Sequence, residues 1–195
     1  IHVFDSETLN LVFLKTYQED KDNYFEPNDL VVDDEANVFA LGKLFISGKS
    51  KKKDGDANYD FVLNKISKDN NQSIKISLES DNFISSLAIN YYDNKLSLVG
   101  FYSNEREGNI KGGCNFMINA SSLSITSKKN TELPKDVYED LYGDAKAERH
   151  DRKKKELNSF YVDYVVRDNT GNTFVLAEEF YVTQTYVATG MNGAG

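Results

Sequence analysis

The chain has 195 residues and a formal net charge of −8, which argues against a protein that holds nucleic acid through general positive charge. The sequence contains no apolar run near the roughly 20 residues that a membrane-spanning helix requires. Twelve Tyr, twelve Phe and only two Pro residues are typical of strands joined by polar turns.

The first predicted elements are two short strands, a polar loop and a hairpin. They cover residues 1–4, 11–17, 18–28 and 30–41. Pro27 favours the loop, because a proline disfavours helical backbone in the residue before it. The hairpin turn is Asp33–Asn37, where Asp and Asn side chains favour a turn by hydrogen bonding to nearby backbone groups.

The hairpin pattern returns at residues 86–101 and 163–178. Together with the strands between the copies, it predicts units of four antiparallel strands that begin roughly 55 residues apart, a period typical of propellers and solenoids. The predicted units lie near residues 1–46, 59–102 and 112–187. Because four strands per unit are typical of propeller blades, we expect an all-β fold of β-propeller-like antiparallel blades, about three in number. These blades form one repeat domain over residues 1–195.

Two features modify these units. Gly42, Gly100 and Ala177 occupy matching places, and a small residue there predicts close backbone approach between neighbouring sheets. The third unit carries a charged insertion at about residues 135–157. Pro134 suits the start of a helix, so we expect a solvated helix or a mobile arm within this blade.

Several segments resemble one family of proteins. They are Pro27–Gly42, Asp60–Asp69, Val175–Val182 and the Lys-rich Arg152–Lys155. With them, the chain resembles the uncharacterised secreted β-propeller-repeat proteins of Bacteroidetes over nearly its whole length. The resemblance rests on structural motifs, so it implies a periplasmic, cell-surface or extracellular location and no known activity. No catalytic residue follows from it.

Cys114 is the only cysteine, so the chain forms no internal disulfide. This is compatible with the cytosol and also with a Gram-negative periplasm or surface. The sequence begins abruptly with the strand-like Ile1–Phe4 and lacks an initiator Met and a signal sequence. We therefore expect a piece of a longer protein, since propellers typically have about four to eight blades.

A series of alternating oxygen-bearing residues resembles the first ligands of a calcium loop. The series is Asp54, Asp56, Asn58 and Asp60. The match is incomplete, because Tyr59 occupies the place of the central glycine and Lys65 that of the closing glutamate. A polar loop without metal is the favoured interpretation, and calcium is the alternative.

Other candidates for chemistry have structural interpretations. The acidic turn residues recur at the same place in two hairpins, which favours turn chemistry over metal ligation; they are Asp33, Asp34 and Asn37, and Asp168, Asn169 and Asn172. Neither His2 nor His150 has a Cys or a second His at ligand spacing, which argues against zinc. Cys114 lies among apolar residues, as expected of a buried structural thiol. We expect no enzyme, since no nucleophile elbow or phosphate-binding loop occurs.

Surface features are the remaining candidates. Glu178 and Glu179 face opposite sides of a predicted strand, so one of them would line a propeller channel unless both only guard a sheet edge. The pairs Tyr91–Tyr92 and Phe180–Tyr181 would stack on glycans or pack against a protein, with Phe180 expected in the core. Two basic runs read as solvated faces or as docking sites for an acidic partner or lipid headgroups; they are Lys49–Lys53 and Arg149–Lys155.

These patterns favour a noncatalytic β-propeller protein that acts as a protein–protein binding scaffold, without nucleic acid or a transmembrane segment. The resemblance implies that this scaffold is an envelope or cell-surface protein within a larger envelope complex. The alternative is a carbohydrate-binding or glycan-active propeller that uses channel carboxylates and tyrosines. A purely structural repeat spacer is the third interpretation.

Overall fold

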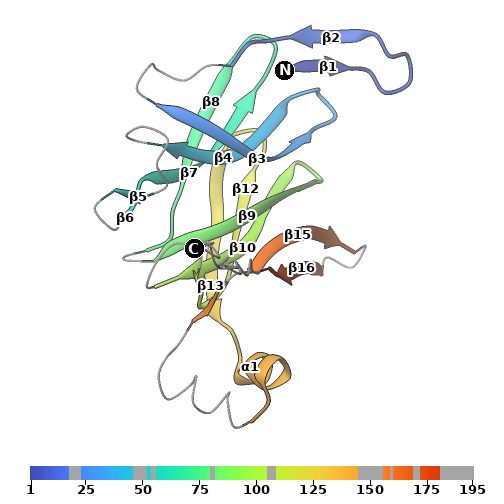
Figure 1. Ribbon diagram of the computed structural model, residues 1–195. Coiled ribbons are helices and arrows are strands. Elements are labelled where there is room, and N and C mark those ends of the chain that lie inside the picture. Colours follow the sequence, from blue (N-terminus) through green and yellow to red (C-terminus); the bar gives the residue numbers. More distant parts are fainter. Residues whose placement is uncertain are drawn as a thin grey trace, which may run out of the picture.

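The computed structural model describes nine parts of the chain, which are residues 1–17, 23–45, 52–53, 56–79, 82–104, 109–144, 156–158, 160–168 and 172–180. Figure 1 shows antiparallel sheets that follow one another along the chain, with the short helix α1 (Lys135–Tyr142) at one end. The expected all-β class is confirmed. The described strands do not form a closed ring.

Two four-stranded sheets form the centre of the molecule, and each runs up and down in chain order. Sheet I contains β3 (Tyr24–Val32), β4 (Val38–Phe45), β7 (Tyr59–Ile66) and β8 (Asn71–Ile76). Sheet II contains β9 (Phe83–Tyr92), β10 (Lys95–Ser103), β12 (Gly112–Asn119) and β13 (Ser124–Glu132).

The remaining strands form pairs. The two longer pairs are β1 (His2–Phe4) with β2 (Leu11–Leu14), and β15 (Phe160–Arg167) with β16 (Thr173–Glu179). The two short pairs are β5 (Lys52–Lys53) with β6 (Asp56–Ala57), and β11 (Asn109–Ile110) with β14 (Leu157–Asn158). The helix α1 spans Lys135–Tyr142.

The sheets are stacked face to face. The largest apolar core lies between sheets I and II, where Phe39 and Leu41 of β4 pack with Leu96 and Leu98 of β10. A second core joins the other face of sheet I to the β1–β2 hairpin; its buried residues are Val3, Phe13, Val38, Ala40 and Ile66. On the far side of sheet II, β15 lies beside β9. The order of the stack is therefore β1–β2, sheet I, sheet II and β15–β16, as Figure 1 shows.

The first strands of the successive sheets lie side by side. β9 lies next to β3 on one side and next to β15 on the other. The backbone N–H of Ile89 in β9 donates to Asp29 Oδ2 of β3 at 3.0 Å, and the guanidinium of Arg167 in β15 lies 3.5 Å from the ring centre of Tyr92 in β9. The outer edge strand β13 is almost entirely exposed and carries Lys128 and Lys129, which discourages pairing with another chain.

The β3–β4 and β15–β16 hairpins have the same pairing. Pro27 faces Gly42 and Asp29 faces Leu41, with a bulge between them. Val162 faces Ala177 and Tyr164 faces Leu176 around an equivalent bulge. The last pairs of the two hairpins match as well, since Val32 faces Val38 and Arg167 faces Thr173. Each residue of the first hairpin therefore corresponds to the residue 135 positions later in the second.

The structure corrects three expectations about strands. Pro27 lies inside β3 and not in a loop; it is tolerated because β3 is an edge strand with a bulge at this point. The small residues Gly42 and Gly100 do permit close approach, but to the paired strand of the same sheet, since an added Cβ would lie 2.4 Å from Glu26 O and 1.9 Å from Ser86 O.

The third difference is the grouping of strands. Each observed four-stranded sheet joins the last two strands of one predicted unit to the first two strands of the next. The predicted units near 1–46, 59–102 and 112–187 each had the repeated hairpin as their last two strands. In the structure, the hairpin supplies the first two strands of each four-stranded sheet. Of the predicted insertion at 135–157, the structure places a helix at Lys135–Tyr142, and residues 145–155 lie outside the described parts.

Candidate binding surfaces

Large apolar side chains are exposed mainly at the two ends of the stack. On the outer face of β15–β16 they are Tyr161, Tyr164, Val166, Phe174 and Leu176, and we call this set the β15–β16 face. On and next to β1–β2 they are Ile1, Phe4, Leu9, Leu11, Val12 and Leu14. Contiguous exposed apolar surface of this kind marks interaction sites on soluble proteins.

The corresponding face of sheet I shows what such a surface packs against. Phe174 and Leu176 are each 59 % exposed, whereas their counterparts Phe39 and Leu41 are fully buried. Phe39 and Leu41 owe that burial to sheet II, whose residues share their apolar core. The β15–β16 face therefore has the composition of a sheet–sheet interface and lacks the covering sheet among the described residues.

A groove lies between the β1–β2 hairpin and β3, and we call it the β1–β3 groove. Its volume is about 680 Å³. Its lining comes from β1, from the segment after β2, from β3 and β4 and from the end of β7; the residues include His2, Phe4, Tyr17, Phe25, Leu30, Val32, Val38 and Ala40. The described lining includes β1 and not β2, so the groove is bordered by the edge of β1 that has no partner among the described strands.

Comparison with sheet II shows that the groove is under-covered. In sheet I, Leu30 pairs with Ala40, which lies two residues before Gly42. In sheet II, Ile89 pairs with Leu98, which lies two residues before the matching Gly100. Leu30 and Ile89 are therefore counterparts. Leu30 is 60 % exposed, whereas Ile89 is 6 % exposed because sheet I covers it.

Of the four predicted calcium residues, the structure describes the side chains of Asn58 and Asp60. Asp54 lies outside the described parts, and only the backbone of Asp56 is described. Asn58 is buried, and the carboxylate of Asp60 forms an ion pair with Lys75 at 2.8 Å. Among the residues whose side chains are described, no three metal-binding side chains come together.

The acidic turns have the expected local chemistry. Asp33 Oδ1 accepts the backbone N–H of Asn37 at 2.8 Å, and Asp33 Oδ2 accepts its side-chain amide at 2.8 Å. Asp168 makes the same two bonds with Asn172, at 2.8 and 2.9 Å. The carboxylates are thus used to close the turns, which supports the turn interpretation.

The predicted thiol and aromatic residues are distributed as follows. Cys114 is buried, and burial raises the pKa of its thiol to about 12, which leaves almost no thiolate at neutral pH.

Tyr91 stacks on Phe39 with ring centres 6.3 Å apart. Phe180 is 58 % exposed, so its expected place in the core is wrong. It follows a hairpin whose outer face is not covered by any of the described sheets. Of the histidines, His2 is exposed, and His150 lies outside the described residues.

The predicted carboxylates Glu178 and Glu179 are both exposed. Glu178 lines a shallow hollow of about 410 Å³ together with Tyr161, Asp163 and Phe180. The rings of Tyr161 and Phe180 lie edge to face, with centres 6.2 Å apart. The basic runs cannot be placed in the same way, since only Lys52 and Lys53 have a described backbone.

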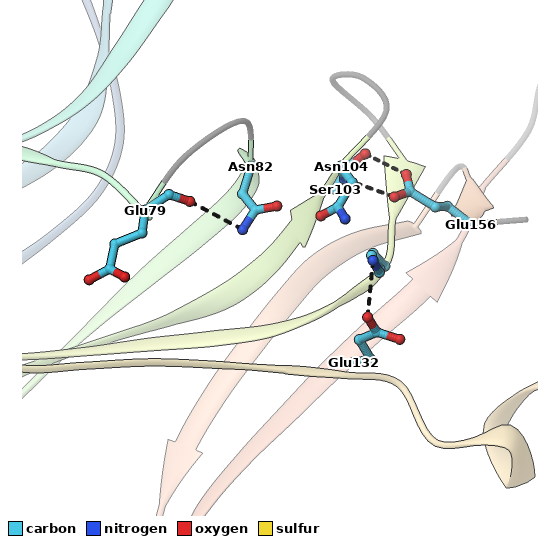
Figure 2. A network of polar contacts seen from close by, with 7 residues as sticks. Glu79, Asn82, Ser103, Asn104, Glu132 and Glu156 are labelled. Atoms are coloured by element: carbon cyan, nitrogen blue, oxygen red, sulfur yellow. Dashed lines mark hydrogen bonds and ion pairs between the residues drawn. The ribbon is translucent and has the colours of Figure 1, made fainter. Parts of the chain in front are cut away.

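Sequence reasoning missed a polar network at the end of sheet II (Figure 2). Glu156 accepts hydrogen bonds from Ser103 Oγ and from the backbone N–H of Asn104, the latter at 2.8 Å. Lys111 pairs with Glu132 at 3.0 Å, and this hydrogen bond raises the pKa of Lys111. The bonds of Glu156 attach the segment after the insertion to the end of β10. We therefore interpret the network as structural. No sequence motif marks the bonds of Glu156, because Glu156 lies about fifty residues from Ser103 and Asn104 in the chain.

Comparisons with protein-family models, curated proteins and solved structures found no match. Within the described residues, no helix has the length and apolar character needed to cross a bilayer.

Proposed function

We propose that the stacked sheets are blades of a β-propeller and that the chain is a noncatalytic scaffold for binding proteins. The observation that carries the proposal is the concentration of exposed apolar side chains at the two ends of the stack, while the core between the central sheets is fully buried. A face with three large aromatic side chains and two aliphatic ones has the composition of a protein interface centre.

The arrangement of the strands supports the propeller interpretation. In a propeller, four-stranded blades are arranged around a central channel, so the innermost strands of neighbouring blades adjoin. Here β3, β9 and β15, each the first strand of its sheet, lie side by side. The last strands, β8 and β13, form the outer edges, and most of their residues are exposed. The resemblance to secreted propeller-repeat proteins supports a periplasmic or cell-surface location.

Affinity purification with the chain as bait tests the scaffold function. Wild-type protein is expected to retain a protein partner in stoichiometric amount. Leu176→Asp, which places a charge on the β15–β16 face, is expected to lose it. Ile125→Asp is the matched control, because Ile125 is exposed on the outer strand β13. Recovery of the same proteins by wild type and Leu176→Asp would refute the proposal.

A glycan-binding function is the second candidate, supported by the hollow that joins two aromatic rings to two carboxylates. Aromatic faces stack on sugar rings, and carboxylates accept hydrogen bonds from sugar hydroxyls. A glycan array probed with wild type, Tyr161→Ala and Glu178→Gln tests it. Binding to a defined glycan that both substitutions abolish would favour this function over the scaffold.

A further inference from the structure

We propose that the partner of the β15–β16 face is the β1–β3 groove of a second copy of this chain, and that two copies close reciprocally into one ring. This inference rests on the proposed scaffold function and names its partner. Three independent features of the described residues support it: the numbers of strands, the correspondence of faces, and the geometry of the groove.

The numbers of strands are complementary. Each central sheet has four strands, whereas the two end sheets have two strands each. One edge of β16 and one edge of β1 are unpaired in the sheets described. Pairing β16 of one copy with β1 of the other would complete a four-stranded sheet in the order β15, β16, β1, β2, which matches sheets I and II. The two hairpins lie at opposite ends of one stack, so one copy cannot supply both.

The faces that would meet already meet once within the chain. Phe39 and Leu41 of sheet I pack against the face of sheet II that carries Ile89 and Leu98. Phe174 and Leu176 are the counterparts of Phe39 and Leu41, and Leu30 and Ala40 are the counterparts of Ile89 and Leu98. Docking the β15–β16 face over the groove would therefore repeat an interface that the chain already forms.

The groove is also placed for this hairpin. It runs between the unpaired edge of β1 and the exposed side chains Leu30 and Val32 of β3. A two-stranded hairpin in it would pair with β1 along one edge and cover Leu30 and Val32 with its apolar face. It would also lie beside β3 as β9 does on the other side.

Reciprocal docking gives a closed assembly. Each copy contributes two complete sheets, and the two composite sheets bring the total to six, within the roughly four to eight blades of known propellers. The assembly has a two-fold axis, which is the commonest symmetry of soluble oligomers. The exposed apolar faces at both ends of the stack would be buried in the same step.

Sedimentation velocity of the whole chain over a wide concentration range tests the proposal. We expect a species with twice the 22.1 kDa mass of one chain. Leu176→Asp, on the β15–β16 face, and Leu30→Asp, in the groove, are each expected to give a monomer. Ile125→Asp should remain a dimer, because Ile125 is exposed but lies on the outer strand β13. Circular dichroism of every variant verifies the fold.

Mixing the two monomeric variants provides the decisive arm. Leu176→Asp keeps an intact groove and Leu30→Asp keeps an intact β15–β16 face, so a mixture can form one of the two contacts. We expect a heterodimer that neither variant forms alone, which general stickiness would not produce.

Other outcomes would overturn the proposal. A wild-type chain that stays at 22.1 kDa, a dimer unaffected by both substitutions, or a series of ever larger species would each exclude the closed two-copy ring. A monomer that still captures a different protein through Leu176 would assign the face to that protein, and the scaffold function would stand without this inference.

Discussion

Replacing Gly100 by Ala tests how sheet II is built. Gly100 lies on β10 opposite Leu87 of β9, two residues before the bulge in this pair. A Cβ atom at Gly100 would lie 1.9 Å from Ser86 O and 2.9 Å from Leu87 Cα. Both are backbone atoms, so no side-chain rotation can relieve the contact. The strands must move apart where β9 also contacts β3 and β15.

The expected loss of stability follows from these distances. The contact with Ser86 O is shorter than a normal non-bonded separation by more than about 1 Å. Overpacking of this kind costs about 1–3 kcal/mol, and each ladder hydrogen bond that is disturbed adds about 1 kcal/mol. The lower entropy of unfolded Ala returns about 0.5–1 kcal/mol. Gly100→Ala should therefore lower the free energy of unfolding by about 2–3 kcal/mol.

Gly113→Ala is the matched control on the neighbouring strand β12. A Cβ at Gly113 would have its nearest contact at 3.8 Å, with Gly100 O, which is an ordinary van der Waals distance. This variant should be as stable as wild type or more stable by about 0.5 kcal/mol. Urea unfolding followed by circular dichroism measures both, with midpoints and m-values compared. Equal stability of the two variants would refute the close approach of β9 and β10.

Three further predictions concern single side chains. Because burial raises the pKa of Cys114 to about 12, the folded protein holds a proton that the unfolded chain releases near pH 8.5; stability should fall as pH rises from about 9 to 12. The free energy of unfolding of Cys114→Ala should not show this part of the decline. If the free energies of wild type and variant fell in parallel with pH, the raised pKa of Cys114 would be contradicted. Asn64 is buried, and its amide has no hydrogen-bond partner in the described parts. Asn64→Leu should therefore raise the free energy of unfolding by about 1 kcal/mol. A lower free energy of unfolding for this variant in urea titration would disprove this. Since Asp60 is paired with Lys75, calorimetric titration with Ca²⁺ should give no heat of binding. Heat that disappears in Asp56→Asn would restore the calcium alternative.

Local features were predictable from the sequence because their causes lie within a few residues. The turn Asp33–Asn37 closes through hydrogen bonds between residues four apart, so the sequence contains both partners. Alternating burial along β12, which placed Cys114 in the core, follows from side chains pointing to opposite faces of a strand. The all-β class follows from the number of such segments.

The candidate surfaces could not be predicted in this way. Phe39 and Phe174 have the same place in the same hairpin, yet one is buried and the other exposed. The difference depends only on whether another sheet lies over the hairpin. The β1–β3 groove likewise depends on contacts between segments far apart in the chain.

The strands, the turns and the recurrence of one hairpin follow from residue type and short-range periodicity, so they were predictable from the sequence. Which strands share a sheet is a long-range choice that similar hairpins leave open, so it is known from the folded structure. The folded structure placed the repeated hairpin first in each sheet and left two-stranded sheets at the ends of the stack. Burial in a β-sheet stack is determined by the neighbouring sheet, and the two end faces of this chain therefore carry the functional proposal.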